Sequence, residues 1–176
     1  MRSNDLKKAL EPYIKLSPFF GIGLVLVAIT VVWIFYIQRG AHVDLAGGIQ
    51  KVRTMALDDN SSVAVVDFRF VNTSDYLFIV RTADVYLTGQ DGQETPGEVV
   101  SEVDAQRLFQ YYPVLGQKFN DSLLIRTKIK PHQSMDRMLA VRFEMPEKQL
   151  EARQQLRIRI EELDGPISNL VEVRKK

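Results

Sequence analysis

The stretch Ser62–Asn72 reads SVAVVDFRFVN, and its period of two decides the fold class. One set of alternate positions is wholly apolar: Ala64, Val66, Phe68 and Phe70. The other set combines one valine with two charged residues: Val65, Asp67 and Arg69. Alternation of this kind is typical of a strand with one face toward a core and the other toward water. We therefore predict a half-buried β-strand over these residues.

Six further segments show the same alternation or are rich in β-branched and aromatic residues. They are Gly47–Leu57, Tyr76–Gly89, Ser122–Lys130, Met138–Met145, Leu156–Leu163 and Ile167–Val173. We expect strand on both sides of Thr82 and Ala83 within the second of these, which gives seven or eight short strands. Many closely spaced strands with few helices predict a mainly β chain, folded as an immunoglobulin-like antiparallel β-sandwich.

Polar and glycine-containing segments mark the connections between these strands. Asn72–Asp75 (NTSD) carries side chains that bond nearby backbone in turns, and Gly89–Gly97 (GQDGQETPG) is predicted to be a turn or exposed loop. One short helix is predicted over Asp104–Tyr112, with Asp104 as its N-cap. A second short helical turn is expected within Glu147–Gln154.

Two parts of this pattern resemble a known family. Val63–Gln93, where an alternating strand ends in Asn72 and a short turn leads to a second strand and a glycine-containing loop, resembles the central hairpin of LEA-14/WHy-type domains. It is also similar to membrane-tethered immunoglobulin-like β-sandwich domains of bacterial envelope proteins. Ile129–Pro146 resembles the later element of these domains, in which a proline-centred turn leads into a strand that ends in proline. The resemblance implies binding or stabilising work without catalysis.

A different feature, PFFGIGLVLVAITVVWIFYI at Pro18–Ile37, contains no charged residue. As an α-helix, the 19 residues from Phe19 to Ile37 span roughly 28 Å, close to the thickness of the bilayer hydrocarbon. A cleaved signal peptide has a shorter apolar region that ends in small residues, and a buried soluble helix is rarely apolar on all faces for this length. We therefore predict an uncleaved signal anchor, a single-pass transmembrane helix over residues 18–38 in the lipid bilayer.

Basic residues around this run predict the topology. Four of them precede it: Arg2, Lys7, Lys8 and Lys15. Near its other end lies Arg39, and an excess of Lys and Arg favours the cytoplasmic side. We expect a cytoplasmic tail over residues 1–17, a linker over 39–46 and an extracytoplasmic β-sandwich domain over 47–176. In a bacterium this predicts the inner (cytoplasmic) membrane, with the N-terminus in the cytoplasm and the C-terminal domain in the periplasm.

The composition excludes several functional classes. The chain has no cysteine, which removes disulfides, thiol nucleophiles and cysteine-ligated zinc or iron–sulfur clusters. The net charge is +1, and from residue 40 onward 18 basic side chains stand beside 20 acidic ones, so no nucleic-acid partner is expected. The two histidines are His42 and His132, and neither a G-x-S-x-G elbow nor a phosphate-binding glycine loop is present. We predict no catalytic residues, no cofactor and no enzyme activity.

The sharpest chemical candidate is the segment HQSMDRM, with His132, Met135 and Met138 as a candidate metal site. Imidazole and thioether are soft ligands that suit Cu(I), and this spacing clusters them on a helix. The segment is expected to be a turn that enters a strand, however, where the three side chains diverge. The competing interpretation is that Met138 packs in the core and His132 is solvated.

The most aromatic connector is RLFQYYPVLGQKF, Arg107–Phe119. One interpretation is that it covers an open end of the sandwich, because apolar residues usually belong to a core. The other is a docking surface, since apolar patches rich in tyrosine are enriched at protein interfaces. The candidate interaction residues are Leu108, Phe109, Tyr111, Tyr112 and Phe119.

Two functional hypotheses follow. The first is a non-catalytic, membrane-anchored interaction or scaffolding module, an accessory subunit of a larger membrane protein complex. Its partners are other membrane or envelope proteins, and a homo-oligomer is left open. The alternative is an extracytoplasmic ligand or copper carrier, or an assembly chaperone, that uses the methionine cluster or a pocket between the sheets.

Overall fold

The computed structural model describes residues 18–38 and 44–173 of the 176-residue chain. The chain divides into two compact units, Met1–His42 and Val43–Lys176. The predicted tail over residues 1–17, and residues 39–43 of the predicted linker, lie outside the described residues. The first strand of the second unit begins at Leu45, two residues before the predicted domain boundary.

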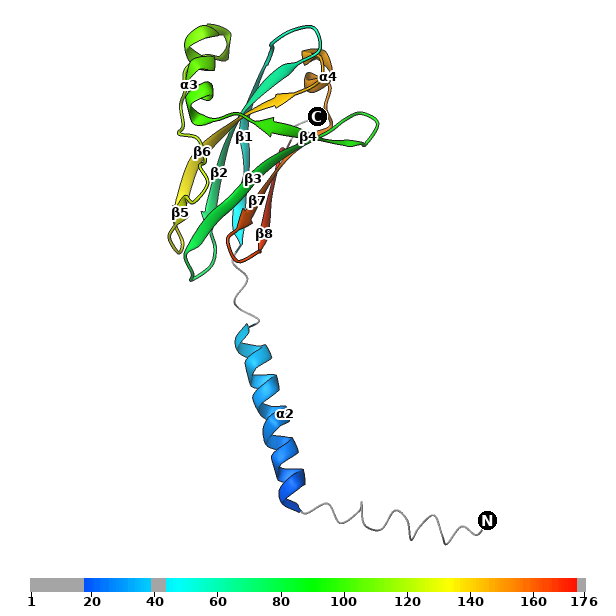
Figure 1. Ribbon diagram of the computed structural model, residues 1–176, viewed down its shortest axis with the longest axis vertical. Coiled ribbons are helices and arrows are strands. Elements are labelled where there is room, and N and C mark those ends of the chain that lie inside the picture. Colours follow the sequence, from blue (N-terminus) through cyan, green and yellow to red (C-terminus); the bar gives the residue numbers. More distant parts are fainter. Residues whose placement is uncertain (1–17, 39–43, 174–176) are drawn as a thin grey trace, which may run out of the picture. The chain divides into compact units, whose positions relative to one another are not determined.

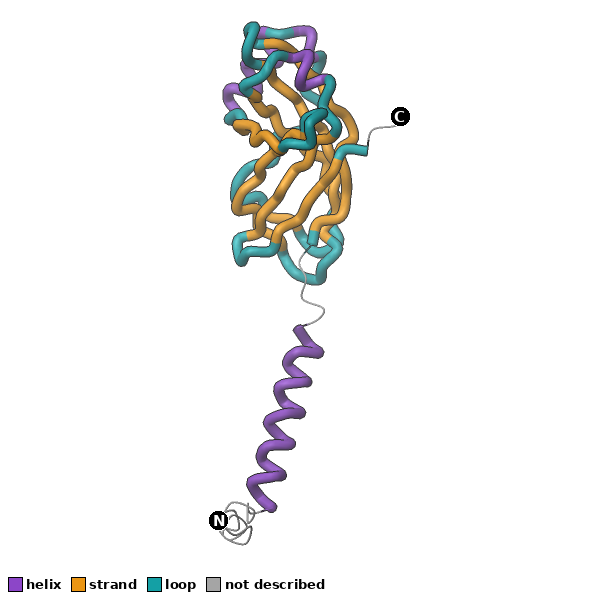
Figure 2. Tube along the Cα trace, turned by 90° about the vertical axis from the view of Figure 1, so that its right-hand side faces the viewer, coloured by secondary structure: helices purple, strands orange, loops and turns teal. Residues whose placement is uncertain are grey.

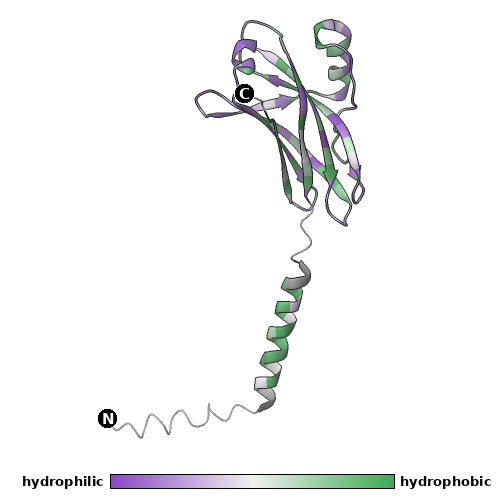
Figure 3. Cartoon of the chain, turned by 180° about the vertical axis from the view of Figure 1, so that it is seen from behind, coloured by the Kyte–Doolittle hydropathy of each residue, from purple (hydrophilic) through white to green (hydrophobic). Residues whose placement is uncertain are grey.

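The described part of the first unit is helix α2, Pro18–Gln38. Proline at the first helical position costs no hydrogen bond, and the run that follows contains no charged residue. Apolar side chains described over residues 21–35 are exposed, among them Leu24, Val27 and Trp33. Figure 3 shows that most of this helix carries the colour of hydrophobic residues. Within the described residues, no helix is long and apolar enough to cross a membrane. The transmembrane span stays a prediction.

The second unit is built on an antiparallel sheet (Figures 1 and 2). Its eight strands are β1 (Leu45–Ala56), β2 (Ser62–Asn72), β3 (Phe78–Thr88), β4 (Glu94–Val99), β5 (Lys128–Ile129), β6 (Ser134–Phe143), β7 (Gln155–Glu162) and β8 (Ile167–Val171). They follow the spatial order β1-β2-β6-β4-β3-β7-β8, and β5 pairs with β3 off this path. The prediction of a mainly β, antiparallel fold is confirmed.

Strand β4 is shared between the two layers of the sandwich. Its Glu98 and Val99 pair with β6, whereas its preceding residues from Glu94 to Gly97 pair with β3. Gly97 permits this crossing, because a Cβ there would lie 2.3 Å from Cγ1 of Val141. The main core fills the space between the layers. Its large, fully buried side chains include Phe68, Phe70, Phe78, Phe143, Leu156 and Ile158.

Strand β2 is buried on both faces, so the prediction of a half-buried strand is wrong. One face supplies the main core, as predicted, with Ala64, Val66, Phe68 and Phe70. On the other face Val63, Val65 and Asp67 are buried as well, and Arg69 is exposed. The covering elements are helix α3 (Glu102–Tyr111) and the 3-10 helix η1 (Pro113–Leu115), which form a second, smaller core with this face.

Helix α3 begins at a different cap from the one predicted. The N-cap is Ser101, whose Oγ accepts a hydrogen bond from the Asp104 amide at 3.2 Å and donates one to Asp104 Oδ2 at 2.7 Å. A serine hydroxyl can satisfy an orphan amide of the first turn in this way, so the helix starts earlier. A second helix, α4 (Glu147–Glu151), lies within the predicted helical turn, so the domain has more than one short helix.

The segment Ser122–Lys130 is not the strand that was predicted. Ser122 bridges to Met138 beside β6, and the backbone then turns through Arg126, whose φ is 66°. A left-handed residue ends an extended run, so only the short strand β5 forms before the chain turns again. The segment Gly89–Gly97 was predicted to be a turn or exposed loop over its whole length. Its turn is shorter than that, and strand β4 begins within the segment, at Glu94.

The turn at Asn72–Asp75 confirms the prediction of side-chain bonding to backbone. Asn72 is fully buried, and its Nδ2 donates to the carbonyl oxygens of Tyr76, Ile129 and Lys130 at 2.7, 3.2 and 3.3 Å. Its Oδ1 accepts from the amide and the hydroxyl of Ser74 at 3.0 and 2.8 Å. One amide therefore joins the β2–β3 turn to the end of β5.

Replacing Asn72 with alanine is expected to lower the free energy of unfolding by about 3 kcal/mol, because it leaves buried carbonyl and amide groups without partners. Urea unfolding of the full chain in detergent micelles, followed by circular dichroism, measures the loss. Asn60→Ala is the control, since Asn60 is exposed. Equal stabilities of the two variants contradict the assignment.

Candidate docking site

The candidate docking site lies on a segment that we call the cap, residues 101–120, which contains α3, η1 and the loop that follows. The cap covers the outer face of β1, β2 and β6, at the end of the domain where β1 finishes (Figure 1). Its Ala105 and Leu115 are buried against Met55, Val63 and Val65. The cap therefore covers a sheet face, and not an open end of the sandwich.

Arg53 of β1 holds the cap to the sheet. Its Nη2 lies 2.7 Å from Oδ2 of Asp67 on β2, and its Nη1 donates to the carbonyl oxygens of Leu115 and Gln117 at 2.5 and 2.8 Å. The other carboxylate oxygen of Asp67 accepts from Nδ2 of Asn120 at 2.9 Å. One ion pair thus joins two strands to three points of the cap.

The Arg53 guanidinium also contacts two aromatic rings of the cap. Its Cζ lies 5.2 Å from the ring centroid of Phe109 and 5.4 Å from that of Phe119. The Arg53 and Asp67 side chains are 11% and 7% exposed. A planar guanidinium can face rings and donate at its edge at the same time, which an ammonium group does less well. The position of the cap therefore depends on an arginine.

The predicted interaction residues divide between core and surface. Leu108 and Phe109 are half-buried and pack against the second core. Tyr111, Tyr112 and Phe119 are exposed, and the exposed fractions of Tyr111 and Phe119 are 75% and 64%. The structure thus places all five residues on the cap, but Leu108 and Phe109 stabilise the second core and are only partly available to a partner.

Two valines extend the exposed part of the cap. Val114 in η1 is 76% exposed, and Val103 in the first turn of α3 is also exposed. Neither is among the predicted interaction residues. We call the resulting set the cap surface: Val103, Tyr111, Tyr112, Val114 and Phe119.

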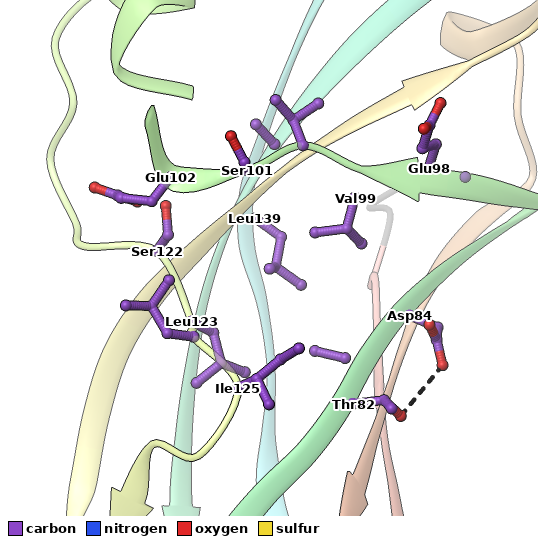
Figure 4. Close-up of a pocket in the computed structure, with 15 residues that line it drawn as sticks. Thr82, Asp84, Glu98, Val99, Ser101, Glu102, Ser122, Leu123, Ile125 and Leu139 are labelled. Atoms are coloured by element: carbon purple, nitrogen blue, oxygen red, sulfur yellow. Dashed lines mark hydrogen bonds between the residues drawn. The ribbon is translucent and has the colours of Figure 1, made fainter. Parts of the chain in front are cut away.

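A cleft of about 750 Å³ adjoins the start of the cap (Figure 4). It lies between β3 on one side and β4, β6 and residues 122–125 on the other. Its apolar lining includes Val99, Leu123, Ile125 and Leu139. Ser101 and Glu102, where α3 begins, form the part of the wall that continues into the cap.

Glu102 ties the loop of the cap to α3. Its carboxylate oxygen Oε1 accepts hydrogen bonds from Lys118 and, at 3.1 Å, from Nε2 of Gln106. Burial opposes ionisation, but the hydrogen bonds from Lys118 and Gln106 and the neighbouring Ser122 hydroxyl outweigh it and hold the pKa of Glu102 below its ordinary value of 4.5. The group is therefore charged at neutral pH and anchors Lys118.

The structure does not bring the candidate metal ligands together. Met135 packs against the main core and Met138 is buried in the second core, on the opposite face of β6. His132 is exposed, with its Nε2 2.9 Å from Oδ1 of Asp75. Among the described residues, no group of three or more His, Asp or Glu side chains could hold a metal ion. His42 lies outside the described residues.

Comparison with known proteins gives no family. The chain matches no family description and none of the curated proteins. Among solved structures it is similar to a chain of the archaellum periplasmic stator protein complex FlaF and FlaG from Sulfolobus acidocaldarius. The identity is 12% and the TM-score is 0.33, over 75% of this chain and 89% of that chain. A likeness at this level assigns no function.

Sequence reasoning misses Arg53 and Asp67 as residues of the site. A charge at an alternate position of a strand is ordinarily solvated, so Asp67 is expected on the water side. Val63 and Val65 lie on the same face of the strand as Asp67, and these two apolar residues are the signal that could have predicted the burial of Asp67. Two valines on the outer face of a strand indicate that another element packs over this face. An aspartate on the same face is then buried, and it needs a positively charged side chain beside it.

Replacing Arg53 or Asp67 singly with alanine is expected to lower the free energy of unfolding by about 3–5 kcal/mol, because either change leaves a buried charge unpaired. The double variant loses less than the sum of the two, since the residues form one interacting unit. Urea unfolding measures all three values. The control is Arg69→Ala, whose pair with Asp136 is 62% and 44% exposed and therefore contributes little to stability. Additive single effects contradict the coupling.

Acid is expected to weaken the Glu102 contact. A carboxyl whose folded pKa is depressed contributes stability above its unfolded pKa and loses it as the pH falls through the folded pKa. The stability difference between the wild type and Glu102→Gln should therefore be full at neutral pH and shrink below about pH 4.5. Urea unfolding at a series of pH values measures it, with Glu144→Gln, an exposed change elsewhere, as control. A difference that is constant with pH contradicts the assignment.

Proposed function

We propose that the protein is a non-catalytic, membrane-anchored scaffolding module that docks a partner protein through the cap surface. The observation that carries this proposal is the exposure of Tyr111, Val114 and Phe119 on a segment whose backbone is bonded to the sheet by Arg53. Exposed apolar side chains that gather on one segment are typical of surfaces that another protein covers. The partner is therefore another protein of the same membrane complex, to which this chain is an accessory subunit.

The way the cap is held supports docking. Binding loses free energy for each side chain and loop that must be ordered, so a surface that is ordered beforehand binds more tightly. Here the cap backbone is bonded by Arg53 at Leu115 and Gln117, and Glu102 holds Lys118. The rings that project from it resemble the aromatic anchors of known interface centres.

The apolar helix α2 supports the proposed anchor. Its exposed side chains need an apolar environment, and the uncharged run Phe19–Ile37 has the length of a bilayer span. The proposed topology is single-pass in a bacterial inner membrane, with the N-terminus in the cytoplasm and the β-sandwich domain in the periplasm. The resemblance to membrane-tethered immunoglobulin-like and LEA-14/WHy-type domains agrees with this arrangement.

The position of the cap along β1 suits docking away from the linker. The domain begins at Leu45, and Arg53 lies roughly 26 Å further along the strand. A partner on the cap surface therefore docks far from the residue at which the domain begins. Further copies of the chain are one possible partner, and the experiment below separates them from other proteins.

The double variant Tyr111→Asp/Val114→Asp is expected to lose a stoichiometric partner, because two carboxylates in the centre of an apolar interface cost about 2 kcal/mol or more. Tagged full chain is extracted from its own membranes in mild detergent after an alkaline wash, and co-purifying proteins are identified by mass spectrometry. The control is Val173→Asp, which charges an equally exposed valine away from the cap. Circular dichroism confirms that each variant is folded.

A partner present with the wild type and Val173→Asp but absent with the double variant supports the proposal. A wild-type chain that purifies alone as a monomer contradicts docking, and release by the alkaline wash contradicts the anchor. Recovery of the chain only with itself makes the cap surface a homo-oligomer contact.

A further inference from the structure

Strand β3 has an unpaired stretch along one edge. On that edge it pairs with β5 at Phe78 and Ile79, and with β4 from Val85 onward. Val80 is bonded there by the backbone of Arg126 and Thr127 at 2.7 and 3.0 Å. Among the described residues, no strand pairs with residues 81–84 on this side. The stretch is short, and it lies in the middle of a sheet whose outer strands, β1 and β8, contact each other.

The cleft occupies the fork that this gap creates. Strand β4 leaves β3 after Gly97 and continues along β6 through Glu98 and Val99. Thr82, Ala83 and Asp84 of β3 line the other side of the fork, and Figure 4 shows Thr82 and Asp84 across the cleft from the side chains on residues 122–125. A free strand edge and an apolar wall therefore face the same space.

The charges that line the cleft are all acidic. They are Asp84, Glu98 and Glu102, and no lysine, arginine or histidine lines it. Glu102 is paired with Lys118, whereas Asp84 and Glu98 lie opposite Arg159 and Arg142 in the strand registers and form no salt bridge among the described residues. The apolar part of the lining includes Val99, Leu124 and Ile125, which are all partly open to solvent.

We propose that the cleft binds a short extended segment of the partner protein, which adds to the free edge of β3 at residues 81–84. Unpaired backbone groups on a strand edge are complemented by an extended backbone, and alternate side chains of the added strand then reach pockets on the sheet. The segment carries at least one lysine or arginine, placed between Asp84 and Glu98, and an apolar residue against Val99 and Ile125.

The geometry favours a peptide over a small apolar molecule. The cleft shares Ser101 and Glu102 with the start of the cap, so a protein seated on the cap surface can place a neighbouring segment in it. Backbone bonds to β3 supply affinity, and the acidic lining selects for basic residues. This inference deepens the proposed function, because it names what the partner presents.

The test uses peptides, because peptide binding in the cleft can be measured separately from the docking of a whole protein on the cap surface. Random peptides of about nine residues, long enough for one strand, are displayed on phage and selected against the full chain in detergent micelles. The expected consensus alternates apolar residues with lysine or arginine. A synthetic consensus peptide is then titrated by fluorescence polarisation. Asp84→Lys/Glu98→Lys should weaken it about tenfold or more, which corresponds to about 1.4 kcal/mol.

Two controls make the result specific. Glu144→Lys, which reverses an exposed acidic residue outside the cleft, and Tyr111→Asp/Val114→Asp should both bind the peptide like the wild type. Amide hydrogen exchange on the bound protein should slow within residues 81–84. Failure to select any peptide, a consensus without a basic residue, binding that is unchanged in Asp84→Lys/Glu98→Lys, or exchange that is unchanged at residues 81–84 each overturns the proposal.

Discussion

The buried ion pair between Arg53 and Asp67 is the interaction on which the position of the cap over the sheet depends. Removing two charges from water is costly, and the cost is recovered only when further hydrogen bonds surround the pair. The cap provides these bonds, through the carbonyl oxygens of Leu115 and Gln117 and the amide of Asn120. The pair and the cap therefore stabilise each other, and the outer face of β2 stays dry only when both are present.

The two proposed docking surfaces follow from this constraint. Because Arg53 fixes the inner side of the cap, rings and valines on its outer side are presented to solvent in an ordered arrangement. The first residues of the same segment, Ser101 and Glu102, line the cleft at the fork between β3 and β4. The cap thus connects the apolar cap surface with the acidic cleft. This arrangement agrees with the proposal that a partner protein binds at both places.

The sequence predicts those features that depend on local periodicity. Alternation locates β2 and β7 closely, because successive side chains of a strand point to opposite faces of the sheet. It misplaces Ser122–Lys130, where a left-handed Arg126 ends the strand, and it cannot show that β2 is covered on both faces. The five candidate interaction residues are predicted from the aromatic composition of their connector alone. The cation that holds them, Arg53, lies far away in sequence, and only the register of β1 on β2 brings it to Asp67.

Amide hydrogen exchange on the full chain in micelles tests the central claim most directly, when the wild type is compared with Arg53→Met/Asp67→Asn. This variant removes the ion pair without leaving a buried charge. If the ion pair holds the cap, amides in residues 105–120 exchange faster in the variant, while those of β2 and β6 that face the main core keep their protection. Unchanged protection of the cap in this variant contradicts the account.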